Sequence, residues 1–175
     1  MPAGLSLEAG PLAPGPGTAR GTLVLQYRLR GDLAEILLPA PASPARRDEL
    51  WRHTCFELFV AEPGGDHYVE FNFSPSTEWA AYGFTGYRQG MQPLPLSMAP
   101  QVACHASRQA VDVTVTVARP DLGRAPSAFV QVPHAMALTA VLEFTGGRMS
   151  YWSLAHPAGR PDFHHRDGFV ATLEL

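Results

Sequence analysis

The chain has 175 residues and a formal net charge of −3, with 46% hydrophobic and 17% charged residues. These values are typical of one globular domain with a sizeable core. The sequence has no long basic run, which argues against nucleic acid or an anionic membrane surface as a partner. It also has no run of about 18 apolar residues, so it predicts no membrane-spanning helix.

Short alternating runs dominate the chain, and its 17 Pro and 16 Gly separate them. In chain order the predicted strands are 23–29, 34–39, 54–61, 67–74, 77–85, 101–107, 110–118, 135–144, 148–154 and 168–175. About ten short strands without a helical period predict an all-β fold, an antiparallel β-sandwich of two sheets that is immunoglobulin- or jelly-roll-like. We expect one domain over residues 21–175 and a loosely ordered segment over 1–20, in which LSLEA could pair as an edge strand.

Cysteine usage and the start of the chain bear on the compartment. Cys55 and Cys104 match no zinc spacing, and two cysteines are too few for a secreted disulfide scaffold. The start, MPAGLSLEAGPLAPGPG, lacks the basic and apolar regions of a signal peptide. We therefore expect a cytoplasmic protein with two free cysteines.

Side-chain parity separates a core face from an outer face in the predicted strands. The expected core residues are Phe56, Leu58, Val69, Phe71, Val113, Val115 and Leu142. Parity then places Glu57, Glu70 and Asn72 together on the opposite face of the 54–61/67–74 hairpin. A tight turn at Gly64-Gly65 puts either Glu70 or Asn72 directly across from Glu57.

Two carboxylates that face each other repel, so the pair Glu57 and Glu70 needs an explanation. An Arg or a cation can neutralise the pair, one carboxyl can be protonated, or both can point into water. The last alternative is a plain solvated face. That face also carries Cys55, Phe59 and Tyr68, and a polar-aromatic face is typical of a ligand cleft. We expect an arginine or a bound cation within salt-bridge reach of at least one carboxyl.

The stretch YWSLAHPAGRPDFHHRDGF, residues 151–169, concentrates His, Asp and Arg among aromatic residues and prolines. It can be a structural loop in which Asp162 and His164 bond backbone amides, a pocket wall that offers His156 and Asp162 to a ligand, or a metal site. No spacing matches a familiar zinc or iron motif, so we expect no metal. We expect an ordered loop between two late strands that walls one end of the ligand site.

Three blocks of the sequence, LWRHTCFELF, EFNFSPSTEW and YWSLAHPAGRPDFH, resemble in order the segments of bacterial DOMON-like proteins. These are small relatives of family-nine carbohydrate-binding modules and of the DOMON domains attached to monooxygenases. The resemblance runs from about residue 23 to the C-terminus. It implies a two-sheet β-sandwich that binds sugar or haem in a sheet cleft or at a sheet edge and has no catalysis of its own.

Haem in DOMON domains typically has a Met and a His as axial ligands. Several of each are available, namely Met91, Met98, Met136, Met149, His105, His134 and His156. The sequence fixes no Met–His pair, so haem is the less favoured ligand, and we expect no cofactor.

Sugar recognition needs flat aromatic faces together with carboxylates, amides and arginines that bond hydroxyl groups. The candidate ligand-binding residues are Trp51, Glu57, Glu70, Asn72, Trp79, Tyr82, Arg88, Trp152, His156, Asp162 and His164. Within the resemblance, Trp79 and Trp152 are the candidate stacking platforms.

The sequence therefore predicts a non-enzymatic domain that binds a small polar ligand, with a carbohydrate or a sugar-containing metabolite as the favoured class. Two alternatives stay open. One is a small hydrolase that uses Glu57 and Glu70 on a glycoside-like substrate. The other is an interaction domain without a small ligand. Nucleophilic catalysis is not indicated, because Cys55 lies in mid-strand and no GxSxG elbow occurs.

Overall fold

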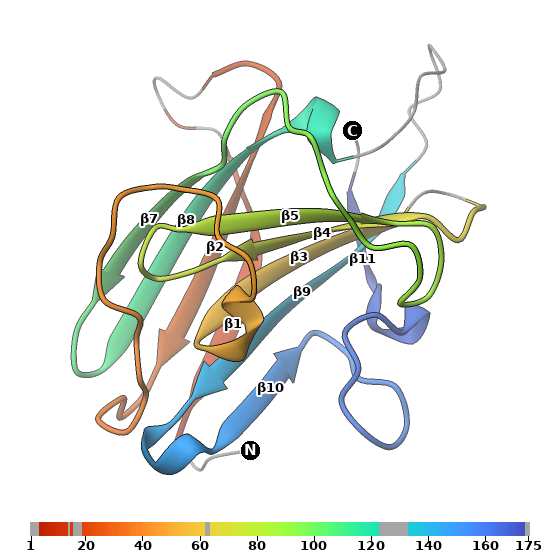
Figure 1. Cartoon of the computed structure of the whole chain (residues 1–175). Helices are drawn as coiled ribbons and strands as arrows, with labels where there is room; N and C mark the ends of the chain where they lie inside the picture. The colour runs from red at the N-terminus through yellow and green to blue at the C-terminus, as the bar shows by residue number, and fades with distance from the viewer. Residues whose placement is uncertain (1–3, 14, 16–18, 62–63, 123–132, 174–175) are drawn as a thin grey trace.

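Two antiparallel sheets packed face to face make up the computed structural model, which describes residues 4–13, 15, 19–61, 64–122 and 133–173 (Figure 1). The four-stranded sheet has the spatial order β1 (Ser6–Leu12), β2 (Thr22–Arg30), β8 (Ala110–Ala118), β7 (Gln101–Ala106). The seven-stranded sheet has the order β10 (Met149–Ser153), β9 (His134–Glu143), β3 (Cys55–Ala61), β4 (Tyr68–Phe73), β5 (Trp79–Phe84), β6 (Gln92–Pro93), with β11 (Ala171–Leu173) also paired to β9. This architecture confirms the predicted all-β sandwich.

Helical structure in the described residues is limited to four 3-10 turns: η1 (Leu50–Arg52), η2 (Arg119–Asp121), η3 (Thr145–Gly147) and η4 (Arg166–Gly168). None of these is long or apolar enough to cross a membrane.

One sequence prediction fails locally. The expected strand 34–39 does not form, and Ile36 makes a single bridge to Phe144. A turn closed by the Ile36 N–H and the Leu33 carbonyl lies there instead, and both apolar side chains are buried in the core. In the N-terminal segment, the LSLEA run pairs as an edge strand, as the sequence allowed. It lies in β1, which pairs with β2 along its whole length and packs Leu7 and Ala9 against the core. Residues 1–3, 14 and 16–18 of that segment lie outside the described residues.

The inter-sheet core is built from alternate positions of the strands, as parity predicts. All seven expected core residues are buried there, and Phe56 and Phe71 are completely inaccessible. The sheets are also joined by a buried hydrogen bond. The Tyr27 hydroxyl on β2 donates to the Glu57 carbonyl on β3 at 2.7 Å, with the Tyr27 ring 5.2 Å from that of Phe56.

Removing this hydrogen bond should measurably destabilise the fold. We expect Tyr27→Phe to lower the free energy of unfolding by about 1 kcal/mol, because the hydroxyl bonds a buried carbonyl. Urea unfolding measures the change. Tyr151→Phe is the control, since the Tyr151 side chain is exposed and its hydroxyl has no partner among the described residues. Equal midpoints for the parent and Tyr27→Phe would contradict the prediction.

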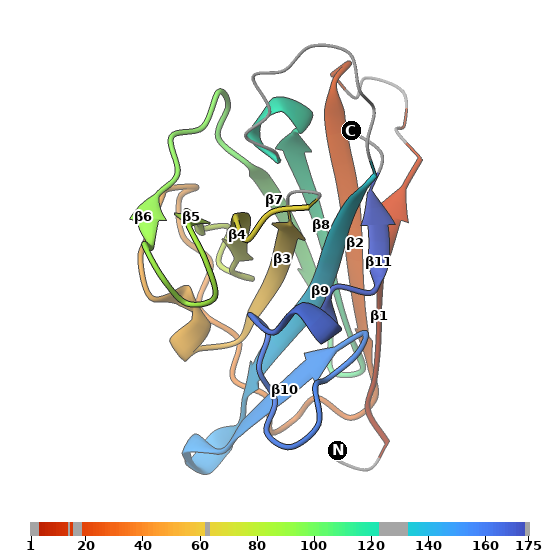
Figure 2. The same cartoon turned by 90° about the vertical axis from the view of Figure 1, so that its right-hand side faces the viewer.

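The outer face of the seven-stranded sheet carries an apolar cluster of its own, so it is not a plain solvated surface. Its buried members are Leu50, Cys55, Phe59, Ala61, Tyr68, Ala80, Tyr82, Phe84, Ala137 and Phe169. The loop that joins β10 to β11 packs on this face and contributes Phe163 and Phe169 (Figure 2). Sequence segments far from the hairpin thus cover the face that carries Glu57 and Glu70.

Candidate functional site

A cavity of about 360 Å³ lies between this outer face and the β10–β11 loop. Small-molecule sites range from about 300 to 1,000 Å³, so the volume suits a small ligand. The sheet contributes Glu57, Phe59, Glu70, Phe84, Val141 and Tyr151. The remaining lining residues are Trp51, Arg88, Met91, Pro161, Asp162, Phe163 and His164.

The predicted common face of Glu57, Glu70 and Asn72 is confirmed by the strand register. Glu57 on β3 lies directly opposite Asn72 on β4, and Glu70 lies opposite Phe59. The two carboxyls are therefore diagonal neighbours across the hairpin. They are 2% and 5% exposed, and Asn72 is completely buried.

Each carboxyl is held by one hydrogen bond to its sheet. Asn72 Nδ2 donates to Glu70 Oε1 at 2.7 Å, and Thr139 Oγ1 donates to Glu57 Oε2 at 2.9 Å. Within the described residues, the second oxygen of each carboxyl accepts no hydrogen bond. Both residues line the cavity, so these oxygens are available to a ligand.

Burial raises the pKa of both carboxyls, and the charge of Glu70 adds to the effect at Glu57. Burial, and then the charge of Glu70, raise the pKa of Glu57 well above its usual range, and the Thr139 hydrogen bond offsets this only in part. Burial also raises the pKa of Glu70 to about 7, although the Asn72 hydrogen bond and the Arg88 charge act in the opposite direction. Of the three explanations that the sequence leaves open, protonation is the one that the structure supports.

No arginine pairs with either of these carboxyls within the described residues, and the expected alternative of a bound cation stays a prediction. Arg88 lines the cavity, but its Nη2 pairs with Asp162 Oδ1 at 2.8 Å. His164 Nε2 lies 3.9 Å from Glu70 Oε2, a contact that becomes an ion pair only when His164 is protonated. The carboxyl repulsion is relieved by protonation, so no arginine is required.

Asp162 fastens the β10–β11 loop to the turn after β5. Its Oδ1 accepts hydrogen bonds from Arg88 Nη2 at 2.8 Å and from the His164 backbone N–H at 3.0 Å, and its Oδ2 accepts one from the Tyr87 hydroxyl. Burial alone would raise the pKa of Asp162, but these three donors and the Arg88 charge lower it. The predicted loop thus walls the cavity with a fixed carboxylate.

The hydrogen bonds around the Tyr68 hydroxyl favour one tautomer of His164. The Arg88 backbone N–H donates to the Tyr68 hydroxyl at 3.2 Å, which leaves the hydroxyl proton free to donate to His164 Nδ1 at 2.8 Å. Nδ1 is then an acceptor, and Nε2 carries the proton toward Glu70. The 3.9 Å between Nε2 and Glu70 Oε2 is too long for a hydrogen bond.

We expect His164 to stay neutral, in the Nε2–H form, well below neutral pH. Burial, and then the Arg88 charge, lower its pKa to about 4, although Asp162 acts in the opposite direction. The ¹⁵N shifts of the imidazole, followed by NMR from pH 8 to pH 4, measure tautomer and protonation. Tyr68→Phe is the control and should lose the tautomer preference. Protonation of His164 near pH 6.5 in the parent protein would contradict this prediction.

Trp79 and Trp152 do not lie in the cavity, which corrects their expected role as stacking platforms. Both are 8% exposed members of the inter-sheet core. Trp79 pairs with Phe73 on the core face and lies under the Arg46 guanidinium at 4.7 Å, and Trp152 pairs with Ala140. Strand parity, which applies to tryptophan as to any residue, turns their rings away from the outer face.

Three other candidates lie around the cavity without lining it. Asn72 holds Glu70, and Tyr82 bonds Asp48 at 2.7 Å and meets the cavity-lining Trp51 edge-on at 5.7 Å between ring centroids. His156 is exposed and stacks on Phe163 at 6.1 Å. Of the eleven candidates, those that line the cavity are Trp51, Glu57, Glu70, Arg88, Asp162 and His164.

Sequence reasoning missed the aromatic and aliphatic lining. Parity places Phe59 on the outer face, although it is not among the eleven candidates, and Phe84 could have been found by continuing the outer-face parity of Tyr82. Phe163 and Met91 lie in irregular segments, where no period predicts orientation. No group of three or more His, Cys, Asp or Glu side chains is arranged to hold a metal ion within the described residues.

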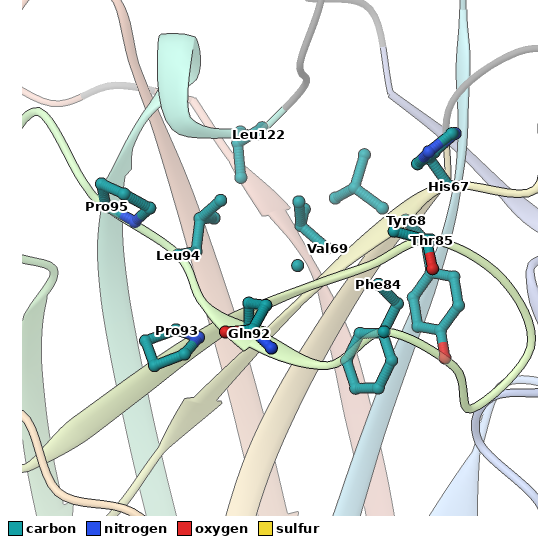
Figure 3. Close-up of a pocket in the computed structure, with 13 residues that line it drawn as sticks. His67, Tyr68, Val69, Phe84, Thr85, Gln92, Pro93, Leu94, Pro95 and Leu122 are labelled. Atoms are coloured by element: carbon teal, nitrogen blue, oxygen red, sulfur yellow. The ribbon is translucent and has the colours of Figure 1, made fainter.

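A second cavity, of about 80 Å³, lies at the end of the sheets near η2 (Figure 3). Val69, Leu94 and Leu122 surround it, and Phe84 lines both cavities. Its volume is far below the range of small-molecule sites. It is therefore a packing gap, and the larger cavity is the candidate site.

Solved structures of other proteins superpose on this chain. A proposed carbohydrate-binding protein from Bacteroides uniformis superposes with a TM-score of 0.61 at 15% identity, over 87% of this chain and 72% of that chain. A family 9 carbohydrate-binding module from Caldicellulosiruptor kristjanssonii, in complex with glucose, gives a TM-score of 0.49 at 9% identity, over 89% and 69%. No protein-family model and no curated protein matches the chain. The first of these similarities supports the two-sheet fold, and the ligand has to be argued from the site.

Proposed function

We propose that this protein is a non-enzymatic binding module for a carbohydrate or a sugar-containing metabolite, which it holds in the 360 Å³ cavity. The observation that carries the proposal is the mixed lining. Glu57, Glu70, Arg88, Asp162 and His164 converge on a space otherwise walled by aromatic and aliphatic side chains. A few convergent polar groups in an apolar cavity are the usual composition of a small-molecule site.

The polar groups offer the donors and acceptors that hydroxyl groups need. A protonated carboxyl both donates and accepts, so Glu57 and Glu70 can each bond a hydroxyl in either direction. His164 Nε2–H adds a donor, and Asp162 and Arg88 add charged partners, whose hydrogen bonds are the stronger ones. Phe59 and Phe163 offer apolar faces for the C–H side of a sugar ring.

The fold similarity supports the same ligand class. The Bacteroides uniformis protein, with which this chain shares its fold, is a proposed carbohydrate-binding protein. The relation to DOMON-like domains and the cytoplasmic location stay predictions from the sequence.

A thermal-shift panel of monosaccharides, disaccharides and nucleotide sugars tests the proposal. A ligand that binds only the folded state raises the melting temperature, with a stabilisation of about 2.7 kcal/mol at a concentration of 100 Kd. We expect at least one sugar to give a saturable shift that Glu70→Ala abolishes and that His156→Ala retains. No shift with any sugar would favour an interaction domain without a small ligand.

The raised pKa values also keep a hydrolase as the second candidate. Glycosidases use one protonated and one ionised carboxyl, and burial raises the pKa of both Glu57 and Glu70. Under the binding proposal, aryl glycosides show no turnover above the uncatalysed rate. Turnover that is lost in both Glu57→Gln and Glu70→Gln would establish the hydrolase instead.

A further inference from the structure

Two of the acids that line the cavity are not paired with a cation within the part of the chain that the structure describes. Arg88 is paired with Asp162, so these two contribute no net charge. Glu57 and Glu70 face the same space without a cationic partner of their own among the described residues, apart from the 3.9 Å contact to His164. His164 is neutral at physiological pH because its pKa is about 4. Without a cation that would let them ionise, the two acids keep their protons, so an incoming cation would find two carboxyls able to take its charge.

We propose that the ligand supplies this cation as a protonated amino group bound between Glu57 and Glu70, so that the cavity selects an amino sugar over a neutral sugar. This inference rests on the proposed sugar-binding function and names the class of sugar.

The free acceptor atoms match an ammonium group. Asn72 and Thr139 occupy one oxygen of each carboxyl, and the other oxygens accept no hydrogen bond within the described residues. An ammonium group carries three donors and no acceptor, so it can bond both free oxygens at once. A hydroxyl group has one donor and can satisfy only one of them. Glu57 and Glu70 are only 2% and 5% exposed, so an ion pair between them and an ammonium group is stronger than the same pair in water.

The aromatic lining also favours a cation. Phe59 and Phe84 lie on the sheet beside Glu70, and Trp51, Tyr151 and Phe163 complete the walls. The faces of aromatic rings attract organic cations, and aromatic cages recognise alkylammonium groups in other proteins. Neutral sugars also stack on such rings, so it is the combination with the acid pair that argues for an amine.

The protein's own cations are held away from the pair. Asp162 pairs with the Arg88 guanidinium, whose charge lowers the pKa of Glu70 without offsetting its burial. Burial, and then the Arg88 charge, lower the pKa of His164 to about 4. Among the described residues, the titratable and charged groups around Glu57 and Glu70 are Arg88, Asp162, His164, Tyr68, Tyr82, Cys55 and Tyr27. An ammonium group entering this set ionises at least one carboxyl, which releases a proton to solvent at neutral pH.

Matched sugars test the charge preference. Glucosamine, galactosamine and mannosamine are each compared with the neutral parent sugar and with the N-acetyl derivative, which removes the charge. Isothermal titration at pH 7 should give about tenfold or tighter binding for one of the amines than for both of its controls. Titration in two buffers of different ionisation enthalpy should show net proton release on binding.

Variants connect the preference to the two carboxyls. Glu57→Gln and Glu70→Gln keep the size and shape of the side chain and remove its charge. Each should reduce the preference for the amine over the neutral sugar. The double variant should bind the amine and the neutral sugar equally. Glu8→Gln, at an exposed position of β1, is the control and should bind like the parent. Because the sugar panel uses the parent protein, a variant that fails to fold does not decide the test.

The outcomes separate this inference from the proposed function. Equal binding of neutral and amino sugars overturns the amine inference and leaves the sugar-binding function standing. Binding of cyclohexylamine as tight as that of glucosamine, with no binding of neutral sugars, overturns sugar binding and supports an amine site. Binding of none of these probes at millimolar concentration overturns both.

Discussion

At pH 8, Glu70→Gln should be more stable than the parent protein by about 2 to 3 kcal/mol, and Glu57→Gln should be stabilised in the same direction. Glutamine keeps the shape of a protonated glutamate and can accept the same hydrogen bonds from Asn72 and Thr139. It has no charge to bury. Because the two carboxyls repel each other, the effects of the single variants should not add in the double variant.

The sign follows from the direction of the shift. The unfolded carboxyl of Glu70 titrates near its ordinary pKa of 4.5, and the folded one near about 7. Between these values the folded state holds a proton that the unfolded state has lost, so the stability of the parent falls as the pH rises. The difference between variant and parent should be near zero below pH 4.5, grow through this window and level off above about pH 7.

Urea unfolding of parent and variants at several pH values from 4.5 to 8 measures this difference. Protonation of Asp162 at low pH destabilises the parent and the variants equally, so it does not change the difference between them. Glu8→Gln, at an exposed position, should show no such pH-dependent gain. A stability difference between variant and parent that is the same at all pH values would indicate a packing effect. A variant less stable than the parent at pH 8 would show that the folded protein stabilises the ionised carboxylate.

Strand parity explains why the floor of the site can be predicted from sequence. In a sheet, residues two apart share a face, so the alternation in β3 and β4 is sufficient to place Glu57, Glu70 and Asn72 together. The same rule, applied to β5 and β10, assigns Trp79 and Trp152 to the core. Residue type instead predicts both tryptophans in the ligand site, because tryptophan is common in sugar sites. For Trp79 and Trp152, strand parity predicts the position correctly and residue type does not.

The walls of the site could not be predicted, because they depend on long-range contacts between irregular segments. Asp162 meets Arg88 across 74 residues of sequence, and Tyr68 meets His164 across 96. No period governs the direction of Met91 or Phe163. Likewise, the 34–39 segment has the composition of a strand but folds as a turn, since burying Leu33 and Ile36 decided its conformation.

Asp162→Ala should weaken sugar binding by about 1 to 3 kcal/mol, which is the cost of leaving charged or buried hydrogen-bonding groups without a partner. Asp162 accepts hydrogen bonds from Tyr87, Arg88 and the His164 backbone, so its loss releases both sides of the cavity wall at once. The freed Arg88 cation would then be available to the free oxygen of Glu70, in competition with any ligand. The sandwich core is distant from these contacts, so the fold should be retained.

His156→Ala is the matched control from the same loop. His156 is exposed and contacts Phe163 by stacking alone, outside the cavity, so its removal should change binding by less than about 0.5 kcal/mol. Asp162→Asn should fall between the two, because the amide oxygen still accepts one hydrogen bond but no longer neutralises Arg88. Titration with the sugar that gives the largest thermal shift measures all three variants. Equal affinity in the parent and Asp162→Ala would show that the loop packs on the sheet without shaping the ligand site. A loss of affinity in Asp162→Ala and Asp162→Asn, but not in His156→Ala, would show that ligand affinity depends on the Arg88–Asp162 pair.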